Sequence, residues 1–232
     1  MEVADCVFSD CGGDCVNLGA IQDVRVVNNM FTQVLTPYST ISSTAWFAAV
    51  FPLFCTNVLI TGNVMNGMTG NAIDAPAVWE CIIGNNTIRN SGGCGVGLFD
   101  GAGYSAYGSP RGAQNVTITG NVIENSGRWS SSPFKEGITL FGSTGAAASN
   151  NRIANNVITD TQSTKTQIYG VKGSGTLAGI WVDPSNALTG NATGPKSGVA
   201  PAAVTGAKAG NTALASLLTT LAGFGLITDS ST

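Results

Sequence analysis

The stretch Asn115-Val116-Thr117-Ile118-Thr119-Gly120-Asn121-Val122-Ile123 decides the fold of this 232-residue chain. Apolar and polar residues alternate on both sides of Gly120-Asn121, which is the pattern of two short strands joined at a tight turn. No helical period runs through the stretch. It therefore predicts a strand, a bend and a second strand in immediate succession.

The same phrase returns along the chain, with an asparagine at the same place in each copy. These asparagines are Asn29, Asn63, Asn86, Asn121, Asn156 and, in a degenerate copy, Asn191. Their spacings are 34, 23, 35, 35 and 35 residues, and a feature that recurs at such a period indicates a stacked repeat. We expect the six side chains to form one column in which each amide bonds the next, as in stacked Asn ladders.

A second phrase lies between the asparagines, so each repeat carries two or three short strands. Its clearest copies, 42 residues apart, are Gly95-Val96-Gly97-Leu98-Phe99, Gly137-Ile138-Thr139-Leu140-Phe141 and Gly179-Ile180-Trp181-Val182. Strands of successive turns would stack about 4.8 Å apart, with inward ladders of Val, Ile, Leu and Phe. The sequence predicts an all-β chain that forms a parallel solenoid of about six coils.

The pattern N-V-x-I-x-G-N-x-I at residues 115–123 resembles the right-handed parallel β-helix of pectate-lyase-like proteins. The resemblance extends over about residues 3–193, and it implies a β-helix domain at residues 1–193. This fold carries lyases, hydrolases, epimerases and the bodies of phage tailspikes and fibres. The resemblance therefore implies an architecture and no single function.

The C-terminal region differs in character. Residues 194–210 are small and polar and predict an extended linker, whereas residues 211–232 predict a short helix followed by a terminal strand. A helix this short has only marginal stability in isolation. We therefore expect its apolar face to pack against the same helix of neighbouring chains, with packing on the β-helix as the alternative. The expected interface residues are Leu214, Leu217, Leu218, Leu221 and Phe224. Residues 211–232 also resemble the C-termini of phage structural and fibre proteins, which implies a homotrimer in a virion.

Composition excludes several classes of function. The chain has no His, ten basic residues and a net charge of −3, which argues against His-dependent catalysis, His-ligated metal and nucleic acid as a partner. We expect no metal and no cofactor. The N-terminus lacks the pattern of a signal peptide, and the longest apolar run, residues 45–55, is too short to cross a membrane. We expect the six cysteines to be reduced, buried thiols that pack as small hydrophobes.

Three carboxylates are weak candidates for catalysis because they flank strands of the second phrase. Asp100, Glu136 and Asp183 lie at the edges of strands that the spacing makes equivalent, so we expect them on one wall of the solenoid. Two carboxylates about 5–9 Å apart serve as acid and base or nucleophile in glycoside hydrolysis. The alternative is that all three are ordinary turn or loop residues. Aromatic residues that would stack on sugar rings are Tyr104, Tyr107, Trp129 and Trp181.

Two functions follow from these patterns. The first is a structural and adhesion protein of a virion, a trimeric β-helical fibre or spike module on the particle exterior that contacts other virion proteins or host-surface polysaccharide. The second is a carbohydrate-active enzyme, a polysaccharide depolymerase of the glycoside hydrolase type that acts through outer-face carboxylates. A lyase or an epimerase is less favoured, because the chain has no His and no acidic run to hold calcium.

Overall fold

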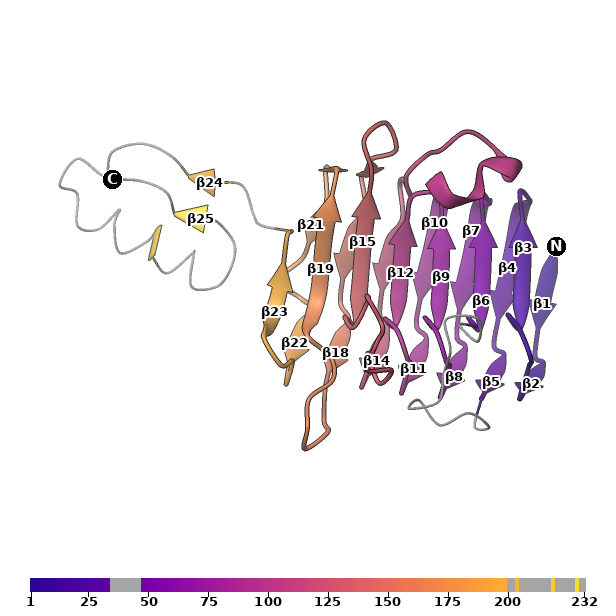
Figure 1. Cartoon of the computed structure of the whole chain (residues 1–232), viewed down its shortest axis with the longest axis horizontal. Helices are drawn as coiled ribbons and strands as arrows, with labels where there is room; N and C mark the ends of the chain where they lie inside the picture. The colour runs from indigo at the N-terminus through magenta and orange to yellow at the C-terminus, as the bar shows by residue number, and fades with distance from the viewer. Residues whose placement is uncertain (34–46, 200–202, 205–217, 220–227, 230–232) are drawn as a thin grey trace.

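Three parallel sheets of seven strands each wrap around one core and form a right-handed parallel β-helix (Figure 1). The computed structural model describes residues 1–33, 47–199, 203–204, 218–219 and 228–229. Each turn of the chain adds one strand to each sheet, and every strand between the first and the last of its sheet pairs with its equivalents in the turns before and after. The solenoid predicted from the sequence is confirmed, with seven strands per sheet in place of about six coils.

We name the sheets A, B and C in the order in which the chain visits them. Sheet A holds β1 (Glu2–Ala4), β4 (Gln22–Val27), β7 (Thr56–Thr61), β10 (Trp79–Gly84), β13 (Thr117–Thr119), β17 (Arg152–Ala154) and β21 (Trp181–Val182). Sheet B holds β2 (Val7–Ser9), β5 (Met30–Thr32), β8 (Val64–Asn66), β11 (Thr87–Arg89), β14 (Val122–Glu124), β18 (Val157–Thr159) and β22 (Ala187–Thr189). Sheet C holds β3 (Val16–Gly19), β6 (Val50–Leu53), β9 (Ile73–Pro76), β12 (Val96–Phe99), β15 (Ile138–Gly142), β19 (Tyr169–Gly175) and β23 (Gly194–Ser197).

The core consists of ladders in which like residues stack from one turn to the next. Ile60, Ile83, Ile118 and Ile153 pair directly across β7, β10, β13 and β17, and none of them is exposed. Burying an aliphatic side chain of this size contributes about 1.5–3 kcal/mol. The strand alternation read from the sequence thus places the apolar residues inward and fixes the register, because a slip of one residue would turn every ladder outward.

The asparagine column is present at the turn between sheets A and B. Asn29, the first member, accepts one hydrogen bond at Oδ1, from the backbone N–H of Cys6. Each later ladder asparagine accepts two, one from the backbone N–H and one from the Nδ2 of the preceding ladder residue. Asn63, for example, donates both to Asn86 at 3.0 Å. Asn29, Asn63, Asn86, Asn121 and Asn156 all belong to the column. The five are almost fully buried, so these bonds satisfy polar groups that water does not reach.

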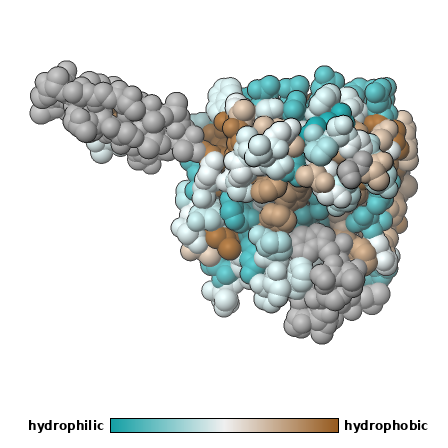
Figure 2. Space-filling view, turned by 45° about the horizontal axis from the view of Figure 1, so that its top comes forward, coloured by the Kyte–Doolittle hydropathy of each residue, from teal (hydrophilic) through white to brown (hydrophobic). Residues whose placement is uncertain are grey.

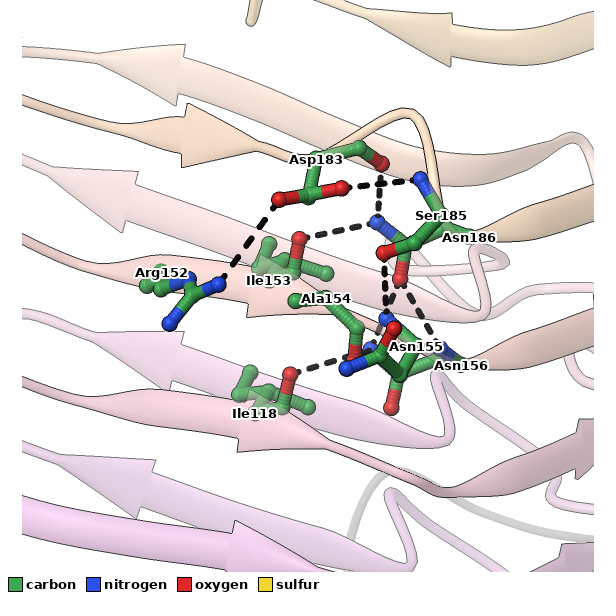
Figure 3. A network of polar contacts seen from close by, with 9 residues as sticks. All are labelled: Ile118, Arg152, Ile153, Ala154, Asn155, Asn156, Asp183, Ser185 and Asn186. Carbon is green, nitrogen blue, oxygen red and sulfur yellow. Dashed lines mark hydrogen bonds and ion pairs between the residues drawn. The ribbon is translucent and has the colours of Figure 1, made fainter.

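The sixth member of the column is Asn186, and the prediction of Asn191 is wrong. Asn156 donates from its backbone N–H and its Nδ2 to Asn186 Oδ1, at 3.0 and 2.8 Å (Figure 3). Asn191 instead accepts a bond from Gln167 Nε2. It follows β22, whereas a ladder residue precedes its strand in sheet B. The last interval is therefore 30 residues, because this coil carries a smaller insertion than its neighbours.

For the first five ladder asparagines, the residue before the asparagine makes the bend. Asn28, Gly62, Asn85, Gly120 and Asn155 have φ between 55° and 69°. Asn and Gly tolerate this left-handed region with little strain. The turn needs only two residues, so the long insertions of the coils lie elsewhere, at the ends of the strands of sheet C.

The longest described insertion follows β12 and includes the 3₁₀-helix η2 (Ala102–Tyr107). In Figure 1 it runs from β12 back across the ends of strands in earlier coils. The edge of the Tyr104 ring packs on Phe51 of β6, with centroids 5.7 Å apart, and Tyr107 lies over Gly19 of β3. Residues 50–53, within the apolar run of the sequence, are thus a core strand whose outer side chains the insertion covers.

The C-terminal region is described only in part. The β-helix runs through β23, so it extends past residue 193 into the expected linker. Two-residue strands β24 (Ala203–Val204) and β25 (Thr228–Asp229) pair in parallel, and a further small pair is β16 (Ala148–Ser149) with β20 (Leu177–Ala178). Leu218 is buried. Leu214, Leu217, Leu221 and Phe224 lie outside the described residues.

All six cysteines are free thiols, but only three of them are buried, whereas we expected all six to be buried. Cys55, Cys81 and Cys94 are buried, whereas Cys6 is exposed. Across the described ranges, no group of three or more acidic, Cys or His side chains is placed to hold a metal ion. A search of those same ranges finds no helix with the length and apolar character needed to cross a bilayer.

Candidate functional site

An open hollow lies on the outer face of sheet C, over its first three strands and beneath η2. Its volume is about 330 Å³. Its walls carry two carboxylates, one amide, two tyrosines and two apolar side chains: Asp14, Asn17, Phe51, Leu53, Asp74, Tyr104 and Tyr107. We call it the tyrosine hollow.

The strand register explains how this set converges. Asn17 of β3 pairs with Phe51 of β6, and Val50 pairs with Ile73, which places Phe51 beside Asp74 of β9. These outward positions alternate with the buried ladders of the same strands. Asn17 and Asp74 therefore lie two strand spacings apart, about 10 Å, with Phe51 between them.

Each carboxylate is oriented by an amide three residues away. Asn17 Nδ2 donates to Asp14 Oδ2 at 3.0 Å, and the backbone N–H of Ala48 donates to Asp14 Oδ1 at 2.8 Å. Asn71 Nδ2 donates to Asp74 Oδ2 at 3.0 Å, while Asn71 itself is buried and accepts a bond from the backbone of Cys94. The two acids are thus held on the sheet face by fixed donors.

The Tyr104 hydroxyl lies within the field of both carboxylates. Its pKa is raised, first by burial and then by the negative charges of Asp74 and Asp14. All three causes disfavour the phenolate, so Tyr104 remains a neutral hydrogen-bond donor at neutral pH. The hollow therefore combines two acids and one hydroxyl donor with the faces of two aromatic rings.

The three carboxylates predicted from the sequence do not share a wall. Asp100 follows β12, Glu136 precedes β15, and Asp183 follows β21 in sheet A. The prediction is wrong because Gly179-Ile180-Trp181-Val182 belongs to sheet A. The strand that pairs with β15 is β19.

Each of the three has a structural role. Asp100 accepts a bond from the backbone of Ala102 where the insertion begins. Glu136 is 0% exposed and accepts bonds from Lys172 Nζ at 3.0 Å and Thr139 Oγ1 at 2.9 Å, so it is not in an exposed loop. Asp183 orders a turn: the backbone N–H of Ser185 donates to it, and Arg152 lies 3.7 Å away (Figure 3).

The four aromatic candidates divide into two that meet and two that do not. Tyr104 and Tyr107 line the tyrosine hollow together, and Tyr107 is 56% exposed. Trp129 is buried, so its face is not offered to a ligand. Trp181 is exposed, but it lies in sheet A with the Arg152 guanidinium 5.1 Å from its ring centre. Only the tyrosines therefore belong to the site.

The sequence reasoning missed Asp14 and Asp74. A signal for them existed in the mirrored phrases Asp14-Cys15-Val16-Asn17 and Asn71-Ala72-Ile73-Asp74. In both phrases an aspartate and an asparagine are three residues apart, with two apolar residues between them. Each phrase lies where a strand of sheet C begins. Recognising the signal requires knowing that the two phrases occupy equivalent coils.

Comparisons with known proteins support the architecture. A crystal structure of alginate lyase from Paenibacillus sp. str. FPU-7 superposes on 91% of this chain and 70% of its own, with a TM-score of 0.56 and 15% sequence identity. The A-module of the Azotobacter vinelandii mannuronan C-5 epimerase AlgE4 matches 85% of this chain and 58% of its own, with a TM-score of 0.40 and 18% identity. No family model matches the chain, and no curated protein does. At these identities the first structure establishes the parallel β-helix fold and nothing beyond it.

Proposed function

We propose that this chain is a carbohydrate-active enzyme that hydrolyses a polysaccharide lying across the outer face of sheet C. The observation that carries the proposal is the convergence of Asp14, Asp74 and the Tyr104 hydroxyl in one open hollow. Two fixed carboxylates are the machinery of most glycoside hydrolases. The tyrosine rings supply apolar faces for sugar rings, and Tyr hydroxyls supply hydrogen bonds.

Asp14 and Asp74 belong to the first and third coils, two strand spacings apart, which is wider than the about 5–5.5 Å of a retaining pair. We therefore propose an inverting reaction with a water molecule between the acids. Asp14, whose two oxygens both accept hydrogen bonds, is the base that takes a proton from this water. The water oxygen bonds to the anomeric carbon, the glycosidic C–O bond breaks, and Asp74, which has taken up a proton from solvent before this step, gives it to the leaving oxygen.

A long polymer suits the site better than a small glycoside. The hollow is open along the sheet, so the ends of a bound chain can pass beyond the strands that hold the acids. The visible coloured surface in Figure 2 mixes hydrophilic residues, residues of intermediate hydropathy and smaller hydrophobic patches, which offers both hydrogen bonds and apolar contacts to a sugar chain. The alginate lyase of similar fold makes alginate a polymer to test first. Neither structural neighbour supports the virion role expected from the C-terminal segment, so we do not carry it forward.

The test is to incubate the full chain with alginate, pectin and neutral glucans and mannans, and to measure new reducing ends. We expect cleavage of one of them, with kcat at least about 100-fold lower in Asp14→Asn and Asp74→Asn, the usual effect of removing a general acid or base. Asp183→Asn is the matched control, because this outer-face acid lies in sheet A and should retain full activity. Thermal unfolding of each variant separates loss of fold from loss of chemistry.

Two results would overturn the proposal. One is the absence of new reducing ends with every polymer under conditions in which the chain is folded. The other is a product with an unsaturated sugar end, seen by its ultraviolet absorbance, because elimination and not hydrolysis produces that group. Equal activity of Asp74→Asn and the wild type would remove Asp74 from the mechanism.

A further inference from the structure

A second hollow adjoins the tyrosine hollow. Its volume is about 510 Å³, and it opens where the strands of sheet C end and those of sheet A begin. Tyr107 lines both hollows, so a single extended ligand can contact the two in succession. We call the second one the arginine hollow, after Arg111 in its wall.

Arg111 is held in a fixed orientation. Its guanidinium lies 4.0 Å from the ring centre of Trp79 and 5.4 Å from that of Phe54. Nε donates to the carbonyl of Ala77 at 3.2 Å, and Nη2 donates to the carbonyl of Phe54 at 3.0 Å. Nη1 has no hydrogen bond to any of the described residues. Two of the three guanidinium nitrogens thus fix the group, and the third is available to a ligand in the hollow.

The charge of the arginine hollow is opposite to that of its neighbour. Among the described residues that line it, Arg111 is the one charged group, and no carboxylate offsets it. Burial lowers the pKa of the guanidinium, because desolvation disfavours the charged form. Arginine binds carboxylate and sulfate groups through short, charge-assisted hydrogen bonds. The tyrosine hollow, with two carboxylates, would repel the same groups.

We propose that the arginine hollow binds an anionic substituent, a carboxylate or a sulfate, on a sugar unit next to the one that is cleaved. This inference rests on the proposed function in that one polymer spans both hollows. The substrate class that follows is a polysaccharide with anionic sugar units. The sugar unit bound in the tyrosine hollow is either neutral or directs its anionic group to solvent. Gln22 and Thr56 are polar residues in the lining of the same hollow.

Binding is measured apart from cleavage, by calorimetry on the Asp74→Asn variant. The ligands are oligosaccharides of equal length that are carboxylated (oligogalacturonate), sulfated (a sulfated galactan oligomer) or neutral (a galactan oligomer). We expect at least one anionic ligand to bind about tenfold more tightly than the neutral one, and its affinity to fall with added salt. The carboxylated and sulfated arms show which anion is recognised.

Substitutions of Gln22 test whether the anion binds in the arginine hollow while Arg111 itself is retained. Gln22→Glu places a carboxylate in the hollow while every contact of Arg111 is kept, and Gln22→Asn is its uncharged control. We expect Gln22→Glu to weaken anionic binding about tenfold and to affect neutral binding much less, while Gln22→Asn has only a small effect on either. Arg111→Lys keeps the charge but loses the planar fork, and we expect an intermediate loss.

Each outcome decides one of the two proposals. Equal affinity for anionic and neutral ligands, or an anionic affinity that Gln22→Glu leaves intact, overturns the anion site even if the wild type cleaves a polymer. Tight anionic binding that Gln22→Glu weakens supports the site even where the wild type cleaves nothing, in which case hydrolysis alone fails.

Discussion

Replacing one asparagine in the middle of the column tests the principle that stabilises this fold. Asn86→Ala removes four hydrogen bonds: two that Asn86 accepts from Asn63, and two that its Nδ2 donates to Ile60 and Asn121. The backbone N–H of Asn63 is then buried without an acceptor, which costs about 1–3 kcal/mol. The other groups keep second partners and lose about 0.5–1 kcal/mol each. We expect the free energy of unfolding to fall by about 4 kcal/mol.

The assay is urea unfolding followed by circular dichroism, with Asn191→Ala as the matched control. Asn191 accepts one bond from Gln167, and its Nδ2 is buried without a partner, so the alanine variant costs only about 1 kcal/mol. The denaturant slope should stay the same in both variants, because the same surface is exposed on unfolding. If Asn86→Ala and Asn191→Ala differ by less than about 1 kcal/mol, the column does not stabilise the fold as we argue.

Three further predictions follow from other buried or charged groups. Lys172→Met leaves the fully buried Glu136 without its cation, so we expect a loss of about 3–5 kcal/mol in urea unfolding, and adding Glu136→Gln should restore part of it. Hydrogen bonds from the turn that follows Asp183, together with Arg152, lower the pKa of this partly exposed carboxyl. Its contribution to stability is therefore present above the unfolded pKa of about 3.9 and is lost as pH falls through the lower folded pKa. We expect the stability of an Asp183→Asn variant to fall less than that of the wild type as the pH is lowered. Thermal unfolding followed from about pH 5 to about pH 2, the range in which carboxyl groups titrate, checks this. Burial raises the pKa of the Cys81 thiol, so iodoacetamide should label the exposed Cys6 first and Cys81 only after unfolding, as peptide mass spectrometry would show.

The sequence alone predicted the coil because each copy of the phrase is decided locally. Alternation, a left-handed residue and an asparagine within a few positions determine a strand, a bend and a strand, whatever the rest of the chain does. The prediction failed at Asn191, where Leu188-Thr189-Gly190-Asn191 imitates the phrase and Gly190 even has the positive φ of a bend. Asn186 fills the column because it precedes the strand that pairs with β18.

The candidate site was harder to predict because its contacts cross coils. Glu136 follows Lys135 in the sequence, which suggests an exposed charged loop, but its partner is Lys172, 36 residues away on the next strand of sheet C. Asp14 and Asp74 converge because β3, β6 and β9 are adjacent, and that adjacency depends on the length of every insertion between them. The sequence identified Tyr104 and Tyr107 as aromatic residues suited to stacking on sugars, but it could not predict where in the fold they lie.

Fold and site are encoded by different parts of this chain. The coil from Asn63 to Asn86 closes in 23 residues, so a turn of the β-helix needs no long insertion. The insertion after β12 adds nothing to the inward ladders, yet it supplies Tyr104, Tyr107 and Arg111 and so forms a wall of both hollows. A structure with only 15% sequence identity to this chain therefore shares its architecture. The proposed chemistry depends on which side chains an insertion places over the acids of sheet C.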